Sequence, residues 1–178
     1  GLPVVSTERF ASFGDFKKVK YRSSVGDMDI PAYVFAPKVK RGARGHAAMV
    51  WVHGGVHGDW NQFMYPFVKE AVDRGYVIIC PDYRGSTGYG KDHYNAIDYG
   101  GYELDDVQSA VDYLKTLPYV DADRIGIMGW SHGGFITAHL VMRDNSPFKA
   151  GAAIVPVTNL VFRLSYKGPG YQRSYATQ

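Results

Sequence analysis

The sequence has little of what marks several protein classes. Its single cysteine, Cys80, excludes an intramolecular disulfide framework and a cysteine-cluster metal site. No apolar run approaches the roughly 20 residues that a membrane-spanning helix needs. The 20 basic and 17 acidic residues are interspersed and leave a net charge of only +3. Neither a nucleic acid nor a membrane surface is therefore indicated as a partner.

What remains is an ordinary globular composition. The 178 residues are 46% hydrophobic and 21% charged, which fits a single folded domain. The 21 glycines gather in short stretches, and there is no repeat, linker or low-complexity tract. No signal peptide is recognised, so we expect a soluble protein, cytoplasmic or a processed secreted form, with the compartment left open.

Apolar runs alternate with helical spacings along most of the chain. Two β-rich runs come first and predict an antiparallel hairpin. The later alternation of strands and helices predicts an α/β fold, with a mainly parallel sheet between flanking helices. We expect loops at 82–101 and at the polar C-terminus, 171–178. The predicted strands are 17–22, 29–36, 47–52, 76–80, 124–129 and 149–155, and the predicted helices are 62–74, 103–117 and 133–142.

A short glycine-rich motif lies between a predicted strand and a predicted helix. Residues 129–133 read Gly-Trp-Ser-His-Gly and match G-x-S-x-G, the strand-to-helix turn that exposes a nucleophilic serine in α/β enzymes. Small residues at both ends of the motif fit such a tight turn, and Ser131 would project above the strand ends. The alternative is a glycine-rich helix start with Ser131 as its N-cap.

A second glycine-rich stretch follows an earlier strand. Residues 53–58 read His-Gly-Gly-Val-His-Gly, which suits a loop whose backbone N–H groups hold an oxyanion. We expect the donors to be the N–H groups of Gly55 and His132. The alternative is a tight turn with incidental histidines. A zinc site on His53 and His57 is disfavoured, because their i, i+4 spacing needs a helix and the glycines oppose one.

Four stretches together carry a family resemblance that covers nearly the whole chain. The chain resembles the α/β-hydrolase domain of the prolyl oligopeptidase family of serine peptidases, particularly the acylaminoacyl-peptidase-like branch. Val56 and His132 depart from it, since proline and tyrosine are common there. The matching residues are Ile30–Tyr33, His53–Gly58, Pro81–Gly90 and Gly129–Gly134.

The resemblance implies roles for particular residues. Ser131 would be the nucleophile, and His53 and Gly54 would border the oxyanion hole. Apart from the resemblance, the position of Trp130 beside the nucleophile suggests that it lines the substrate pocket, although core packing explains it equally well. Tyr89 would pack over the site or simply stabilise its loop. No cofactor or metal is implied.

The remaining members of a catalytic triad are not evident. In this fold the acid and then the histidine follow the serine in the chain. After Ser131 the sequence offers only His132, His139 and Asp144. Neither histidine suits the base, because His132 is the adjacent residue and His139 lies two helical turns away. An upstream base is a lesser alternative, and its candidates are His46, His53, His57 and His93.

We therefore expect residues 1–178 to form the N-terminal portion of one α/β-hydrolase domain, without a β-propeller and without its C-terminal strands. The strand at 149–155 would then be an exposed edge. The triad Asp and His would lie outside this chain, on a complementary C-terminal fragment or a second chain.

The predicted function is a serine hydrolase that cleaves an ester or peptide bond through an acyl-enzyme on Ser131. The alternative is a non-catalytic binding or scaffold domain with the same fold. A nucleotide site is disfavoured, because residues 85–92 place Asp92 where a phosphate loop needs Ser or Thr.

Overall fold

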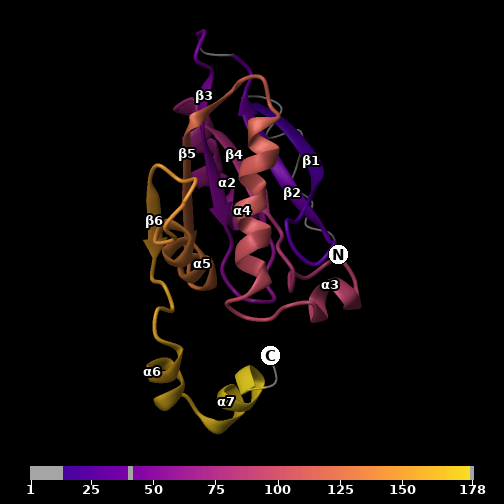
Figure 1. Cartoon of the computed structure of the whole chain (residues 1–178), viewed down its shortest axis with the longest axis vertical. Helices are drawn as coiled ribbons and strands as arrows, with labels where there is room; N and C mark the ends of the chain where they lie inside the picture. Colours follow the sequence, from indigo (N-terminus) through magenta and orange to yellow (C-terminus); the bar gives the residue numbers. More distant parts are fainter. Residues whose placement is uncertain (1–13, 40–41, 177–178) are drawn as a thin grey trace.

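A six-stranded mixed sheet forms the centre of the molecule (Figure 1). The computed structural model describes residues 14–39 and 42–176, with side chains through 173. The strand order is β1-β2-β4-β3-β5-β6. β1 and β2 form the predicted antiparallel hairpin, β2 pairs antiparallel with β4, and the remaining pairs are parallel. The strands are β1 Gly14–Arg22, β2 Asp29–Pro37, β3 His46–Val52, β4 Val77–Pro81, β5 Val120–Trp130 and β6 Gly151–Ile154.

Helices cover both faces of this sheet, as the alternating pattern predicts. α4 and α5 lie on one face and α2 on the other (Figure 1). The 3-10 helix η1 leads directly into α2, where Pro66 stands in the first turn and needs no N–H partner. The helices are η1 Gln62–Met64, α2 Tyr65–Asp73, α3 Lys91–Asn95, α4 Tyr102–Lys115, α5 His132–Val141, α6 Leu160–Ser165 and α7 Pro169–Ala176.

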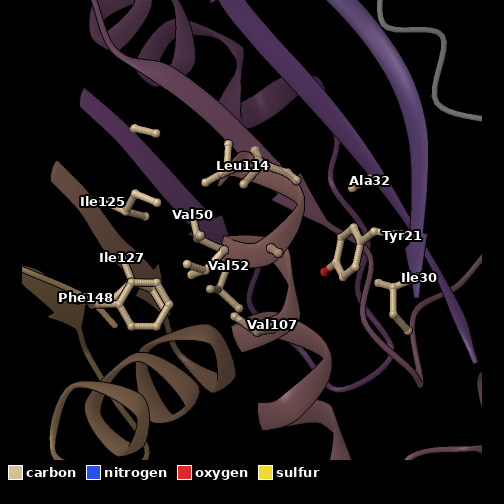
Figure 2. Packing of buried hydrophobic residues seen from close by; sticks show 14 of the residues in the cluster. Tyr21, Ile30, Ala32, Val50, Val52, Val107, Leu114, Ile125, Ile127 and Phe148 are labelled. Carbon is tan, nitrogen blue, oxygen red and sulfur yellow. The ribbon is translucent and has the colours of Figure 1, made fainter. Parts of the chain in front are cut away.

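The two faces of the sheet have separate cores. Successive side chains of a strand point to opposite faces, so Val50 packs toward α4 while Trp51 packs toward α2. Figure 2 shows the α4 side, where Val107 and Leu114 meet residues of β3 and β5. Phe148 packs in the same cluster. This two-sided burial explains why the central strands are continuous apolar runs.

Two expected loops contain helices instead. The 82–101 segment includes α3, a single helical turn after Gly90. The C-terminal loop prediction for 171–178 is wrong up to Ala176, because α7 covers those residues, and 177–178 lie outside the described residues. Figure 1 shows α6 and α7 beyond the carboxyl end of β6, apart from the sheet. Within the described part of the chain, no helix combines the length and apolar character needed to cross a bilayer.

Candidate active site

Ser131 forms a sharp turn between β5 and α5. Its backbone has φ 55° and ψ −119°, a conformation that residues other than glycine rarely adopt. The Ser131 N–H donates to the Ile154 carbonyl at 3.0 Å, and the Ser131 carbonyl accepts from the Phe135 N–H at 2.9 Å. Ser131 occupies the N-cap position of α5, but its side chain makes no capping hydrogen bond. The strained turn places Ser131, a partly exposed residue, at the carboxyl end of β5.

The glycines of the motif are required by close backbone contacts. A Cβ added to Gly133 would lie 2.3 Å from the Val52 carbonyl oxygen. One added to Gly129 would lie 2.5 Å from the Gly133 carbonyl oxygen. These spaces are too small for any side chain. The first turn of α5 therefore packs directly on the carboxyl end of β3, where the 53–58 loop begins.

The 53–58 loop lies beside the Ser131 turn and is held in place by contacts with Trp130 and Tyr83. A Cβ on Gly54 would be 2.7 Å from Cδ1 of Trp130, the residue before the serine. Gly55 has φ 76°, and its carbonyl accepts from the Gly58 N–H at 3.1 Å. The Tyr83 hydroxyl donates to the Gly55 carbonyl at 2.9 Å. The structure thus brings together the two glycine-rich segments that the sequence singles out.

His53 is buried under this loop rather than exposed to a substrate. Its Nε2 lies 2.9 Å from Ser86 Oγ, and its ring stacks on Tyr83 at a centroid distance of 4.3 Å. Burial lowers the pKa of His53 to about 4, although the hydrogen bond to the Gly54 carbonyl opposes the shift. The imidazole is therefore neutral near pH 7 and supports the loop from its inner side.

The other upstream histidines are engaged elsewhere. The Nδ1 atoms of His46 and His57 lie 2.7 Å and 2.8 Å from the carbonyl oxygens of Gly75 and Gly85, respectively. His93 Nε2 lies 3.0 Å from the Tyr83 carbonyl. Among the described residues, no histidine hydrogen-bonds to Ser131. The alternative of an upstream base therefore gains no support from this geometry.

His132 directs its ring away from the serine and toward α4. Its Nε2 lies 3.4 Å from Oε1 of Glu103, and the two side chains are 3% and 0% exposed. Neither ring nitrogen of His132 makes a hydrogen bond of good geometry within the described residues, so Glu103 and His132 are in close contact without being aligned. In the sequence, Glu103 is an acid in the first turn of a predicted helix, where it complements the helix dipole, and nothing there indicates that it contacts His132.

Trp130 and Tyr89 occupy different surroundings. Trp130 is partly buried against Gly54 and makes an edge contact with Phe67 at a centroid distance of 6.2 Å. Trp130 thus adjoins both the serine turn and the α2-side core. The Tyr89 hydroxyl donates to Asp82, and its ring adjoins β1 and His93. Both substrate-binding assignments stay predictions.

Two buried side chains, Asp82 and Arg84, anchor the loop that follows β4. Burial raises the pKa of Asp82 to about 7, against hydrogen bonds from Tyr89 and the Trp60 N–H that lower it. Arg84 does not pair with Asp82, although both follow the same strand. It binds Asp106 of α4 instead, with an Nη2 to Oδ1 distance of 2.7 Å.

The described residues contain no cluster of side chains that could bind a metal ion. No group of three or more His, Cys, Asp or Glu side chains suitable for a metal occurs across residues 14–39 and 42–176.

A hollow of about 420 Å³ lies at the amino-terminal end of the strands, opposite to the end that carries Ser131. It is lined by Arg44, Arg74 and Arg124, among others, and is separate from Ser131.

A comparison with known protein families matches residues 61–176 to the prolyl oligopeptidase family. This region includes the Ser131 turn and three of the six strands, β4, β5 and β6. The chain belongs to the prolyl oligopeptidase family. The family assignment confirms the resemblance seen in the four sequence stretches, and the α/β-hydrolase fold is confirmed with it.

Relatives of known sequence agree with this assignment. The chain is 31% identical over 148 residues to the uncharacterized peptidase YuxL of Bacillus subtilis (strain 168), which covers 82% of this chain and 22% of that protein. It is 31% identical over 149 residues to the acylamino-acid-releasing enzyme of Mus musculus, which covers 83% of this chain and 20% of that protein. The chain thus spans about a fifth of the length of the curated relatives it matches.

Solved structures show the same fold. An acylaminoacyl peptidase in complex with Z-Gly-Gly-Phe-chloromethyl ketone superimposes with a TM-score of 0.72 at 25% identity, over 88% of this chain and 26% of that one. The acylaminoacyl peptidase of Pyrococcus horikoshii gives a TM-score of 0.73 at 24% identity, over 92% and 27% of the two chains.

Proposed function

We propose that this chain carries the nucleophile and the oxyanion site of a serine hydrolase that cleaves an ester or peptide bond. The observation that carries the proposal is the conformation of Ser131, a partly exposed serine held at positive φ beside the 53–58 loop. Ser131 Oγ attacks the carbonyl carbon and gives its proton to a histidine base. The base passes this proton to the departing alcohol or amine, and an acyl-enzyme forms. Water then attacks the acyl group and releases the acid and the free serine.

The backbone N–H groups of Gly55 and His132 are the proposed oxyanion donors. His132 begins α5, where the helix end carries partial positive charge. Gly55 has its carbonyl tied to Tyr83, which fixes this part of the loop. Two such donors aimed at the developing oxyanion contribute about 3 kcal/mol each to catalysis. Gly54 and Trp130 would form the adjacent wall of the substrate site, with His53 supporting it from beneath.

We place the triad histidine and acid in residues outside this chain. Two observations support this. The ring nitrogens Nδ1 of His46 and His57 lie within hydrogen-bond distance of backbone carbonyl groups. In addition, all four residues of the edge strand β6 are exposed. A further segment of the protein that pairs with β6 would bring its residues to the same end of the sheet as Ser131. The reaction as proposed needs no cofactor or metal.

The relatives support a substrate class for the proposed reaction. The mouse relative is named for the release of acylamino acids, and one solved relative holds a peptide-like chloromethyl ketone. These findings support a peptide or acyl-peptide substrate for this chain. Because an acyl-enzyme mechanism also hydrolyses esters, small esters are suitable reporter substrates.

Covalent labelling tests the proposal. The intact protein is incubated with a fluorophosphonate probe, which we expect to modify Ser131. Ser131→Ala should abolish labelling, whereas Ser24→Ala, which removes an exposed hydroxyl from the β1–β2 turn, should label at the wild-type rate. Labelling that persists in Ser131→Ala would exclude this serine as the nucleophile. A folded protein that takes no label would favour the non-catalytic binding or scaffold domain.

A further inference from the structure

A buried carboxylate lies directly behind the Ser131 turn and has no role in the function proposed above. Glu103, in the first turn of α4, is completely buried. Its side chain accepts hydrogen bonds from the N–H groups of Gly100 and Gly101, the latter at 2.9 Å. Its Oε1 faces His132 Nε2 at 3.4 Å. Burying a carboxylate without a compensating partner lowers the stability of the fold by several kcal/mol, so the neighbours of Glu103 must offset this desolvation.

The carboxylate is held in its charged form by these neighbours. Burial acts to raise the pKa of Glu103, but contacts with His132 and the Gly100 N–H outweigh burial, and the pKa lies below its ordinary value. Glu103 thus connects two segments. One is the turn before α4, and the other is the first residue of α5.

Aromatic rings enclose the His132 side chain on its remaining sides. Phe135 stacks on it with an interplanar angle of 17° and a centroid distance of 5.4 Å. Tyr99 lies at 4.5 Å and Tyr83 at 5.9 Å, measured between ring centroids. Tyr99 belongs to the same turn that Glu103 ties down, and its φ is 32°. The ring is therefore confined by packing, and Glu103 is the charged group that faces its nitrogen.

We propose that Glu103 is a positioning residue that acts through His132 on the oxyanion site. The proposal rests on the proposed function, in which the His132 N–H is an oxyanion donor. That N–H belongs to the peptide between Ser131 and His132, whose orientation depends on how the His132 side chain is anchored. The carboxylate anchors the ring and also holds the Tyr99 turn against it. Removing the charge would let the first turn of α5 relax and misdirect the donor.

The expected kinetic effect is specific. Oxyanion donors act on charge that develops only in the transition state, so a misdirected donor lowers kcat and leaves KM nearly unchanged. A small displacement of a positioned group can cost one to two orders of magnitude in rate. We expect Glu103→Gln, which keeps an oxygen for the two N–H groups, to lower kcat about tenfold on a p-nitrophenyl ester. Asp105→Asn, on the same helix and paired with Arg143, is the matched control and should be unchanged.

A double-variant comparison tests whether Glu103 acts through His132. His132→Phe keeps an aromatic ring and removes both nitrogens. If Glu103 acts through this ring, the Glu103→Gln change should cause no further loss of kcat in the His132→Phe background. Loss of equal size in both backgrounds would overturn the proposal, as would an unchanged kcat in Glu103→Gln or an effect confined to KM.

Two further measurements keep the test decisive. If Glu103→Gln does not fold by circular dichroism, His132→Tyr is compared with His132→Phe. The tyrosine hydroxyl can donate to the carboxylate, so His132→Tyr should retain kcat while His132→Phe loses it, and equal values would overturn the proposal. Ser131→Ala is measured alongside. Residual turnover in that variant would refute the proposed function itself, whereas inactive Ser131→Ala with a normal Glu103→Gln would refute only the role of Glu103.

Discussion

At the residue scale, burial shifts the pKa values of Asp82 and His53 in opposite directions. The two groups lie 3.6 Å apart and are both 1% exposed. Burial disfavours the charged form of each, so the pKa of Asp82 rises to about 7 and that of His53 falls to about 4. Both are therefore largely neutral near pH 6. A buried, mostly uncharged pair can support the 53–58 loop without a large desolvation penalty.

The two residues should affect stability in opposite directions as pH changes. Between about pH 4 and 6.5, folded Asp82 binds more protons than the unfolded chain, so its contribution falls as pH rises. Folded His53 binds fewer protons than the unfolded chain over the same range, so its contribution rises with pH. Asp82→Asn keeps the shape and leaves only the His53 effect. We expect its urea midpoint to increase more steeply with pH than that of wild type over this range. Parallel profiles would contradict these pKa shifts.

At the element scale, α4 is joined to the rest of the molecule by Asp106. This buried carboxylate binds the Arg84 side chain at 2.7 Å and accepts from Ser23 Oγ at 2.6 Å. The Tyr21 hydroxyl donates to the Asp106 carbonyl at 2.8 Å. One residue thus connects α4, the loop after β4 and the β1–β2 hairpin. These partners are up to 85 positions away in the sequence.

Removing this carboxylate should be strongly destabilising. Asp106→Ala leaves the Arg84 guanidinium buried without its partner, and we expect a loss of about 3–5 kcal/mol in the free energy of unfolding. Asp112→Ala is the matched control on the same helix. Asp112 is 80% exposed and pairs with Lys115 at 3.7 Å, so its removal should cost less than about 1 kcal/mol. Urea denaturation of the intact protein measures both, and similar losses would contradict the anchoring role.

Elements with strong local patterns could be predicted, and contacts between elements could not. The β1–β2 hairpin and the apolar strand β4 both follow from local residue order. α3 was missed because five residues of a glycine-rich loop carry no periodic pattern. Asp82 is two residues from Arg84 in the sequence, yet Arg84 binds Asp106. That pairing depends on where α4 crosses the sheet, which nearby residues do not encode.

At the scale of the whole molecule, apolar side chains are exposed beyond β6. Val155 is 74%, Val161 81% and Phe162 68% exposed. These residues follow an edge strand that has a free pairing side within the described residues. An apolar surface next to a free strand edge favours pairing with another segment. The surface thus supports the proposal that further residues of the protein complete the sheet here.

Equal substitutions at two equally exposed valines test this proposal. Val161 on α6 and Val39 after β2 are both 81% exposed. If a further segment covers α6 in the intact protein, Val161→Asp buries a charge and should cost about 1–3 kcal/mol in stability. Val39→Asp should stay within about 0.5 kcal/mol of wild type. Equal thermal midpoints for the two variants would argue that α6 remains uncovered.

The sequence alone determined the fold class and the two glycine-rich segments of the candidate site. The apolar periods and the G-x-S-x-G motif are local patterns, and local patterns report strands, helices and turns directly. Only the tertiary structure decided which side chains meet. It buried His53 beneath the loop, turned the His132 ring toward Glu103, and paired Arg84 with Asp106. The physical reason is that burial and ion pairing depend on how distant elements pack, and packing brings together residues that the linear order keeps apart.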